Sequence, residues 1–207
     1  MDGGPWAGGV WVPRGAEGVQ GVPRTVAPTA EPVAFRWTLR DYQSAAADAV
    51  VDAGGGIVQA PCGAGKTVIG CALVSRYDTP ALVLVHTRDL AAQWVDRLRD
   101  SCGVEAGLVG YGKRKRGEAG DEARVVVASL QTLARWGWWR VHEWGQRFGL
   151  VIADEAHHVP ASTWGAVMAG LSARVRVGLT ATPEGPDGLT PILRWHLGET
   201  VARIDPS

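Results

Sequence analysis

After residue 35 the chain alternates between short apolar runs and longer stretches in which apolar residues recur at helical spacing. Short runs rich in Val and Leu are typical of strands buried on both faces of a parallel sheet, and helical spacing gives each helix one apolar stripe. This alternation predicts an α/β fold, a mostly parallel sheet with helices on both faces. The predicted strands are residues 57–60, 81–86, 124–128, 150–153 and 175–179, and the predicted helices are 66–76, 89–100, 131–147 with a break near Gly137, and 161–171.

The first 35 residues lack any sustained period and are rich in Gly and Pro. Such a segment buries too little apolar surface to offset the entropy of ordering it, so we expect residues 1–35 to form a disordered tail. A start codon assigned too far upstream explains the same segment equally well. The chain has 207 residues, and the remaining part, 36–207, has the length of one ordinary domain.

Composition narrows the class of protein. A hydrophobic fraction of 46% is normal for a globular core. No apolar run approaches the about 18 residues of a membrane span, no secretory signal is visible, and three irregularly spaced Cys suit a reducing compartment. We therefore expect a cytoplasmic protein with no membrane partner. The 21 Lys and Arg equal the 21 Asp and Glu, which argues against a globally basic nucleic-acid binder but leaves room for a local basic groove.

The turn after the first predicted strand reads Ala-Pro-Cys-Gly-Ala-Gly-Lys-Thr, residues 60–67. It matches the phosphate-binding pattern Gly-x4-Gly-Lys-Ser/Thr except that Ala60 replaces the first Gly. Gly63 and Gly65 let backbone N–H groups turn towards phosphates at a helix N-terminus. Lys66 can reach the β- and γ-phosphates, and the Thr67 hydroxyl can bind Mg²⁺. The alternative is a Gly-rich strand–helix turn without a ligand, but Lys-Thr in this context favours nucleotide binding.

A second chemical signal follows the predicted strand 150–153, where the chain continues Asp154-Glu155-Ala156-His157-His158. Carboxyl ends of parallel strands meet at one edge of the sheet, where ligands of such folds bind. Asp154 is then placed to hold the Mg²⁺ that bridges two phosphates, and Glu155 to orient and deprotonate the attacking water. The alternative is a solvated loop with an aspartate that caps a helix. A zinc site at the two His residues lacks a third ligand nearby.

Five motifs occur in the order GAGKT (63–67), ALVLVHTRDL (81–90), ASLQTL (128–133), DEAH (154–157) and GLTATP (178–183). In this order the chain resembles the first RecA-like domain of a DEAH-box superfamily 2 helicase, over residues 36–203. The resemblance implies a RecA-like P-loop NTPase fold that uses ATP and Mg²⁺. Residues 184–189 resemble excision-repair helicases and type III restriction translocating subunits, which implies an ATP-dependent DNA helicase or translocase, with DNA rather than RNA as the partner.

The resemblance also implies roles for individual residues. The segment 39–43 looks like the one that contacts adenine in these proteins, so Gln43 and Arg40 carry that role here. Arg88, Ser129 and Thr132 fall where the family contacts the nucleic-acid backbone. Thr180 and Thr182 belong to the motif that couples the ATP state to strand movement, and His157 is the usual partner of that motif. The implied catalytic residues are Lys66, Asp154, Glu155 and His157. For a Ser or Thr at a strand end, capping of the next helix is the alternative.

We expect these 207 residues to lack the family's second RecA-like domain, because the third principal motif ends shortly before residue 207. In resembling enzymes that domain supplies arginine fingers, which are worth about 10³–10⁵ in rate in related NTPases. We expect the isolated chain to bind ATP weakly and to turn it over negligibly, unless a separate polypeptide supplies the second domain. Two alternatives remain open: a non-enzymatic ATP- or DNA-binding module or truncated fragment, and a P-loop enzyme of another kind, such as a kinase.

Two further clusters have open interpretations. The basic run at residues 113–116 is either a solvated hairpin tip or a phosphate contact beside the DNA track. The second cluster, Trp136, Trp138, Trp139 and Trp144, lies near two Arg residues. Trp faces can stack on bases, but we favour packing in the core or at a domain interface because each Trp buries a large area.

Overall fold

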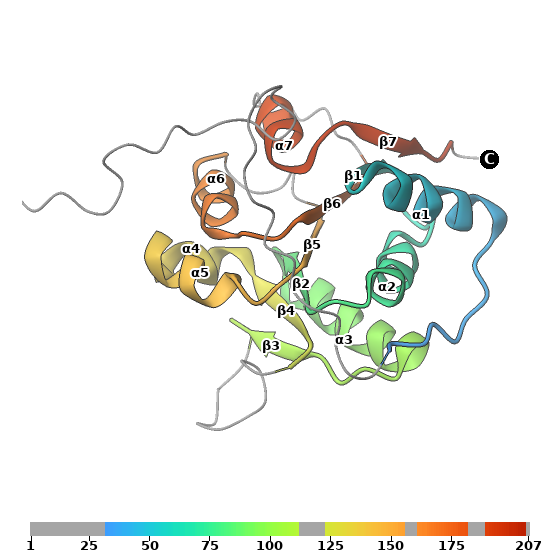
Figure 1. The fold of residues 1–207 in the computed structure, drawn as a ribbon, viewed down its shortest axis with the longest axis horizontal. Coiled ribbons are helices and arrows are strands. Elements are labelled where there is room, and N and C mark those ends of the chain that lie inside the picture. Colours follow the sequence, from blue (N-terminus) through green and yellow to red (C-terminus); the bar gives the residue numbers. More distant parts are fainter. Residues whose placement is uncertain (1–31, 112–122, 156–160, 182–188, 206–207) are drawn as a thin grey trace, which may run out of the picture.

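The computed structural model describes residues 32–111, 123–155, 161–181 and 189–205. Within them seven strands form one sheet in the order β3-β4-β2-β5-β6-β1-β7, and every pair of neighbouring strands is parallel (Figure 1). The strands are β1 (Gly56–Gln59), β2 (Ala81–Val85), β3 (Gly107–Val109), β4 (Val125–Ser129), β5 (Leu150–Asp154), β6 (Val175–Thr180) and β7 (Thr200–Arg203). The predicted parallel sheet is confirmed.

Helices cover both faces of this sheet (Figure 1). One layer consists of α1 (Asp41–Ala53), α2 (Lys66–Tyr77) and α3 (Arg88–Cys102), and the other of α4 (Leu130–Trp136), α5 (Trp138–Gly145), α6 (Ala161–Gly170) and α7 (Leu189–Leu197). Successive strand residues point to opposite layers. In β2, for example, Val83 packs in the core under α1–α3, whereas Leu82 and Leu84 pack in the core under α4–α7. The predicted helices on both faces are thus confirmed.

The structure adds elements that the apolar pattern did not predict. Helix α1 buries only four side chains, Gln43, Ala46, Ala47 and Val50, and because one is polar and two are small they give a weak apolar stripe. Strand β3 has three residues, and β7 is a partly exposed edge strand. The predicted break at Gly137 is confirmed, because this residue ends α4 and precedes α5 with a φ of 78°, a value that favours glycine.

The packed part of the chain begins no later than Val33, which falls within the predicted tail 1–35. Val33 is buried in the core, its backbone N–H donates to Asp78 Oδ1 at 3.3 Å, and its carbonyl accepts from Ser75 Oγ at 2.5 Å. Three residues later the N–H of Arg36 donates to the Ser101 carbonyl at 2.7 Å. These contacts fasten the segment before α1 across α2 and α3. Residues 1–31 lie outside the described part.

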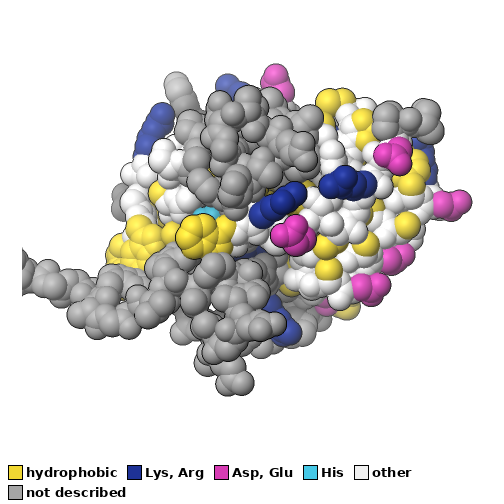
Figure 2. Space-filling model, turned by 90° about the horizontal axis from the view of Figure 1, so that it is seen from above, with side chains coloured by type: hydrophobic (Ala, Val, Ile, Leu, Met, Phe, Trp, Pro, Cys, Tyr) yellow, Lys and Arg dark blue, Asp and Glu magenta, His cyan; other side chains and the backbone are white. Residues whose placement is uncertain are grey.

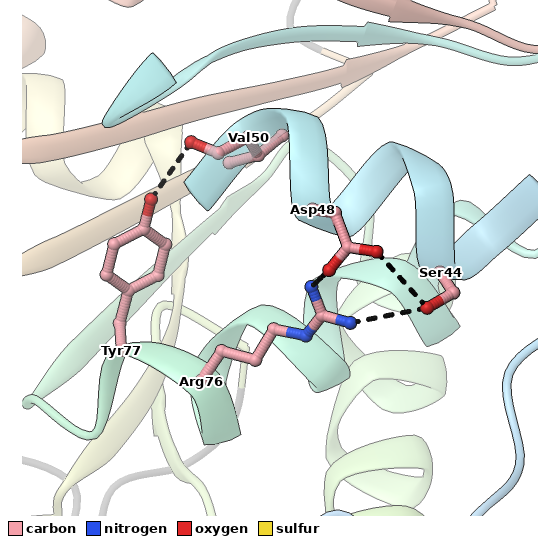
Figure 3. Close-up of polar contacts among 5 residues, drawn as sticks. All are labelled: Ser44, Asp48, Val50, Arg76 and Tyr77. Atoms are coloured by element: carbon pink, nitrogen blue, oxygen red, sulfur yellow. Dashed lines mark hydrogen bonds and ion pairs between the residues drawn. The ribbon is translucent and has the colours of Figure 1, made fainter. Parts of the chain in front are cut away.

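Side-chain contacts fix α1 on α2 (Figure 3). Arg76 of α2 donates to Asp48 Oδ1 at 2.5 Å and to Ser44 Oγ at 3.5 Å, both on α1. The Tyr77 hydroxyl donates to the Val50 carbonyl at 3.1 Å. These contacts lie in the last turn of α2, at the opposite end of that helix from the Gly-rich turn.

The aromatic cluster around Gly137 is mostly packed. Trp136 and Trp144 meet edge to face with ring centroids 5.3 Å apart and contact the core under α4–α7, which confirms core packing for these two residues. Trp139 is 61% exposed and does not share this burial. The basic run at residues 113–116 lies outside the described residues.

The surface carries charges of both signs. Figure 2 views the molecule from the α7 and β7 side, and there Lys or Arg side chains lie close to Asp or Glu side chains among the described residues. This mixture agrees with the equal numbers of basic and acidic residues, 21 each. Among the helices that the structure describes, none has the length and apolar character needed to cross a membrane.

Candidate nucleotide-binding site

The Gly-rich turn connects β1 to α2 at the carboxyl edge of the sheet. Gly63 and Gly65 have φ angles of 84° and 82°, a region that favours glycine. Gly65 also precedes the first residue of α2, and a Cβ there would lie 2.4 Å from Gln43 Nε2. The turn is anchored to the sheet because the Ala60 N–H donates to the Thr180 carbonyl at 2.9 Å. Both positions therefore favour glycine by their backbone conformation, and at Gly65 the Gln43 side chain also crowds any Cβ.

Lys66, the first residue of α2, turns back over this loop. Its Nζ donates to the carbonyl oxygens of Ala60 at 3.0 Å and Pro61 at 3.4 Å. The same Nζ lies 2.9 Å from Glu155 Oε1, and the two side chains are only 10% and 14% exposed. The structure thus brings together two predicted catalytic residues that stand far apart in the sequence.

Asp154 and Glu155 occupy the carboxyl end of β5, as predicted. Asp154 is 4% exposed, and its Oδ2 accepts a hydrogen bond from Trp94 Nε1 at 2.8 Å. Burial raises the pKa of Asp154 to about 6, although the Trp94 hydrogen bond acts in the opposite direction. The next residue, Glu155, has a φ of 52°, which is unusual for a residue with a side chain and turns the chain sharply at the strand end.

The residues of the Gly-rich turn and of the β5 end line a cavity of about 340 Å³, and residues of α3 also line it. The volume is within the usual range of small-ligand sites. Its lining includes Gly63, Gly65, Lys66, Thr67, Asp154 and Glu155, so six predicted residues are brought to one place. On the other side of the Gly-rich turn, a wider hollow of about 700 Å³ lies between α1 and the β7 end and includes Arg40.

The oxygen atoms of this cavity suit a magnesium ion. Asp154 Oδ1 is buried and has no hydrogen-bond partner among the described residues, so this carboxylate oxygen is a candidate metal ligand at the strand end. Thr67, whose side chain carries a hydroxyl, also lines this cavity. Mg²⁺ prefers oxygen ligands and usually takes only one or two of them from the protein, and Thr67 and Asp154 can supply that number.

Gln43 holds the Gly-rich turn from the side of α1. Its Oε1 accepts the Arg40 N–H at 3.0 Å, and its Nε2 donates to the Ala64 carbonyl at 3.1 Å. The Tyr42 hydroxyl donates to the same carbonyl at 3.2 Å and accepts from Arg40 Nη1 at 3.1 Å. Contact with adenine stays a prediction for Gln43 and Arg40. The role of Tyr42 had no signal in the sequence beyond its place in the segment 39–43.

The residues predicted to contact nucleic acid lie at the ends of the neighbouring strands β2 and β4. Arg88 is exposed in the first turn of α3. Ser129 is buried, and its Oγ accepts the Thr132 N–H at 3.3 Å, so Ser129 caps α4 and the capping alternative is confirmed for it. Gln131 Nε2 donates to the His86 carbonyl at 3.3 Å and joins the two strand ends. Contact with nucleic acid stays a prediction for Arg88, Ser129 and Thr132.

The predicted coupling residues are described only in part. Thr180 is the last residue of β6, is buried, and lies beside Gln59 of β1. Its carbonyl anchors the Gly-rich turn, as described above. His157 and Thr182 lie outside the described residues, so their roles stay predictions.

A parallel α/β sheet with a Gly-Lys-Thr turn after one strand and an Asp-Glu pair after another defines a RecA-like P-loop domain. Residues 36–185 match the model of the family described as type III restriction enzyme, res subunit, and the chain belongs to this family of superfamily 2 helicases.

Two curated relatives support this assignment. The chain is 35% identical over 158 residues to the DNA 3'-5' translocase XPB2 of Sulfurisphaera tokodaii, which covers 75% of this chain and 34% of that protein. It is 35% identical over 156 residues to the DNA 3'-5' helicase XPB of Mycobacterium tuberculosis, which covers 73% of this chain and 28% of the relative. The chain thus spans about a third of the length of such relatives.

Solved structures show the same fold. The UvsW helicase from bacteriophage T4 superposes with a TM-score of 0.67 at 23% identity, over 85% of this chain and 64% of that one. The Sulfolobus solfataricus SWI2/SNF2 ATPase core in complex with dsDNA gives a TM-score of 0.66 at 22% identity, over 81% and 37%. The resemblance to a first RecA-like domain, near the XPB and type III restriction branch, is confirmed.

Proposed function

We propose that the chain is the ATP-binding half of an ATP-dependent DNA helicase or translocase and that it binds Mg-ATP and DNA. The observation that carries this proposal is the convergence of Lys66, Thr67, Asp154 and Glu155 on one cavity at the carboxyl edge of the sheet. These residues come from two motifs that are far apart in the sequence, and a Gly-rich turn without a ligand would not require a buried carboxylate beside its Lys.

Each side chain has a part in the proposed reaction. Lys66 and the N–H groups of the Gly-rich turn hold the β- and γ-phosphates. Thr67 and Asp154 hold Mg²⁺, which when bound neutralises phosphate charge. Glu155 orients the attacking water and accepts its proton. In this proposal Gln43 and Arg40 recognise adenine, while Thr180, Thr182 and His157 couple the state of the nucleotide to movement along the strand.

DNA is the proposed polymer because the two relatives are described as a DNA 3'-5' translocase and a DNA 3'-5' helicase. Arg88, Ser129 and Thr132 contact its backbone in this proposal. They lie on one edge of the sheet, at the ends of strands that pair directly through Val85 and Ser129. A protein with this substrate works inside the cell, where the DNA is.

Turnover is proposed to need a second RecA-like domain, from the same or a separate polypeptide. The relatives are about three times as long as the matched region. An arginine finger from such a domain would stabilise the charge that develops on the transferred phosphoryl group. The isolated chain is therefore expected to bind ATP weakly and to hydrolyse it negligibly.

The test measures ATP binding and DNA-stimulated ATPase activity of the 207-residue chain, alone and with a second RecA-like domain from its genomic neighbour or a relative. We expect binding by the chain alone and turnover only in the mixture. Robust DNA-stimulated turnover by the chain alone would contradict the need for the second domain. Failure to bind ATP with Mg²⁺ would contradict the nucleotide site itself. Binding without turnover in every mixture would favour the non-enzymatic module.

A further inference from the structure

A fully buried Trp supports the carboxylate at the end of β5. Trp94 lies on α3 with no exposed surface, and its Nε1 donates to Asp154 Oδ2 at 2.8 Å, across 60 positions of sequence. The other carboxylate oxygen, Oδ1, is buried, and no described residue forms a hydrogen bond with it. The two oxygens of Asp154 therefore differ: one is held by the protein, and the other is available.

The position of the indole ring is set by close packing rather than by the hydrogen bond alone. A Cβ added to Gly70 of α2 would lie 2.2 Å from the Cη2 atom of Trp94 and 3.2 Å from Leu179 of β6. The ring thus fills the space that a glycine leaves between α2 and the sheet. Because a packed ring cannot turn freely, its N–H has one fixed direction, and that direction is towards Asp154.

The geometry points to Trp94 as a positioning residue for Mg²⁺ binding. Its indole N–H holds Oδ2 of Asp154 and so leaves Oδ1 oriented for the metal. This inference rests on the proposed function, in which Asp154 holds Mg²⁺. Groups that hydrogen-bond to a metal ligand fix its orientation, and their loss typically costs about 10–100-fold in metal affinity.

The same helix carries a predicted DNA contact. Arg88 opens α3, and Trp94 follows six residues later, a rise of about 9 Å along the helix. A displacement of α3 on contact with DNA would therefore move the donor that holds Asp154.

The test compares two matched substitutions, Trp94→Phe and Trp164→Phe. Both Trp side chains are fully buried, but Trp164 packs under the other face of the sheet, and within the described part of the chain its Nε1 has no hydrogen-bond partner. The measurement is ADP affinity of the full chain by calorimetry, once with Mg²⁺ and once with EDTA. For Trp94→Phe we expect the gain in affinity that Mg²⁺ confers to fall about tenfold, with affinity in EDTA unchanged. For Trp164→Phe we expect both affinities to match the unsubstituted chain.

The outcomes separate this inference from the proposed function. If the unsubstituted chain binds no ADP in either condition, the proposed function fails. If it binds with a gain from Mg²⁺ that Trp94→Phe leaves intact, or if Trp94→Phe weakens binding equally with and without Mg²⁺, the inference alone is overturned. Should Trp94→Phe not fold, Gly70→Ala replaces it, since the added methyl group displaces the ring without changing a polar group. The same selective loss of the Mg²⁺ gain is expected, and an intact gain overturns the inference.

Discussion

The nucleotide side and the predicted DNA side occupy the same edge of the sheet but are built differently. On the nucleotide side, Lys66, Asp154 and Glu155 are largely buried and contact one another or a fixed donor. On the predicted DNA side, Arg88 is exposed, whereas Ser129 is occupied as a helix cap. Buried charge must be compensated within the protein, and exposed charge is compensated by water. The nucleotide side is therefore preorganised by burial, and substitutions there should affect both folding and binding.

The substitution with the largest expected effect is Lys66→Ala, which disrupts the preorganised nucleotide side. Lys66→Ala removes the cation beside the largely buried Glu155, and we expect a loss of about 3 kcal/mol in unfolding free energy. It also removes a charge-assisted contact with phosphate, whose net contribution of about 1.5–3 kcal/mol corresponds to a fall in ADP affinity of about 10- to 100-fold. Chemical denaturation and calorimetry measure the two quantities.

A second cation on α2 provides the control for that substitution. Arg76 pairs with Asp48 at the surface, where the two side chains are 30% and 59% exposed (Figure 3). Because exposed pairs contribute about 0–1 kcal/mol, Arg76→Ala should cost at most about 1 kcal/mol and leave ADP affinity unchanged. Equal effects of the two substitutions would show that burial does not distinguish the two ion pairs.

The next effect is a pH dependence from Asp154. Its pKa is raised from 3.8 to about 6 in the fold, so the folded state binds the proton more tightly than the unfolded state. Stability from this group is consequently present at about pH 4 and is lost as pH rises through about 6, by about 3 kcal/mol at most. Asp154→Asn removes this loss, so without Mg²⁺ and nucleotide it should be more stable than the unsubstituted chain at pH 7, with the difference shrinking towards pH 4. Parallel denaturation profiles from pH 4 to pH 7.5 would contradict the burial argument.

On the predicted DNA side the effects should be smaller. Ser129→Ala removes the acceptor that caps α4, and loss of such a cap costs about 1 kcal/mol. Thermal or chemical unfolding measures the change. Ser129→Thr retains an acceptor oxygen and should restore most of the stability. If Ser129→Ala leaves stability unchanged but weakens DNA binding, the main role of Ser129 is contact with DNA and not capping of α4.

The smallest effect on stability is expected for Arg88→Ala, within about 0.5 kcal/mol, because the side chain is exposed. DNA binding should weaken a few-fold, and the slope of log affinity against log salt should fall by about 0.9 if one phosphate contact is lost. Arg99→Ala is the matched control on the same helix, since Arg99 is exposed and pairs with Asp96 and Glu105. An identical salt slope for both variants would remove Arg88 from the DNA interface.

The fold and the nucleotide cavity could be predicted from the sequence to a greater extent than the contacts that support them. The parallel sheet, its two helical layers and the cavity around Lys66 follow from local signals: apolar runs, a Gly-Lys-Thr turn and an Asp-Glu pair at a strand end. Parallel strands bring their carboxyl ends to one edge, so local motifs in the correct order meet in space. The position of Asp154 near Lys66 was predictable for this reason.

The support around the site was not predictable, because it depends on contacts between distant residues. Trp94 showed only as one apolar position on an amphipathic helix, and nothing in its neighbourhood indicated a hydrogen bond to Asp154. Gln43 was assigned to adenine by resemblance, whereas its amide also bridges Arg40 and Ala64. Strand β7 lacks a continuous apolar run because it is an edge strand with partly exposed side chains.

The contact between Lys66 and Glu155 has a consequence for ligand selection. Glu155 is a resident counter-ion: before any nucleotide arrives, it already neutralises the ammonium group at 2.9 Å. A phosphate that approaches Lys66 must compete with this carboxylate, so the free energy gained is the difference between two ionic contacts rather than one whole contact. Ligands with little negative charge at that point lose the competition, and the cavity thereby discriminates by charge.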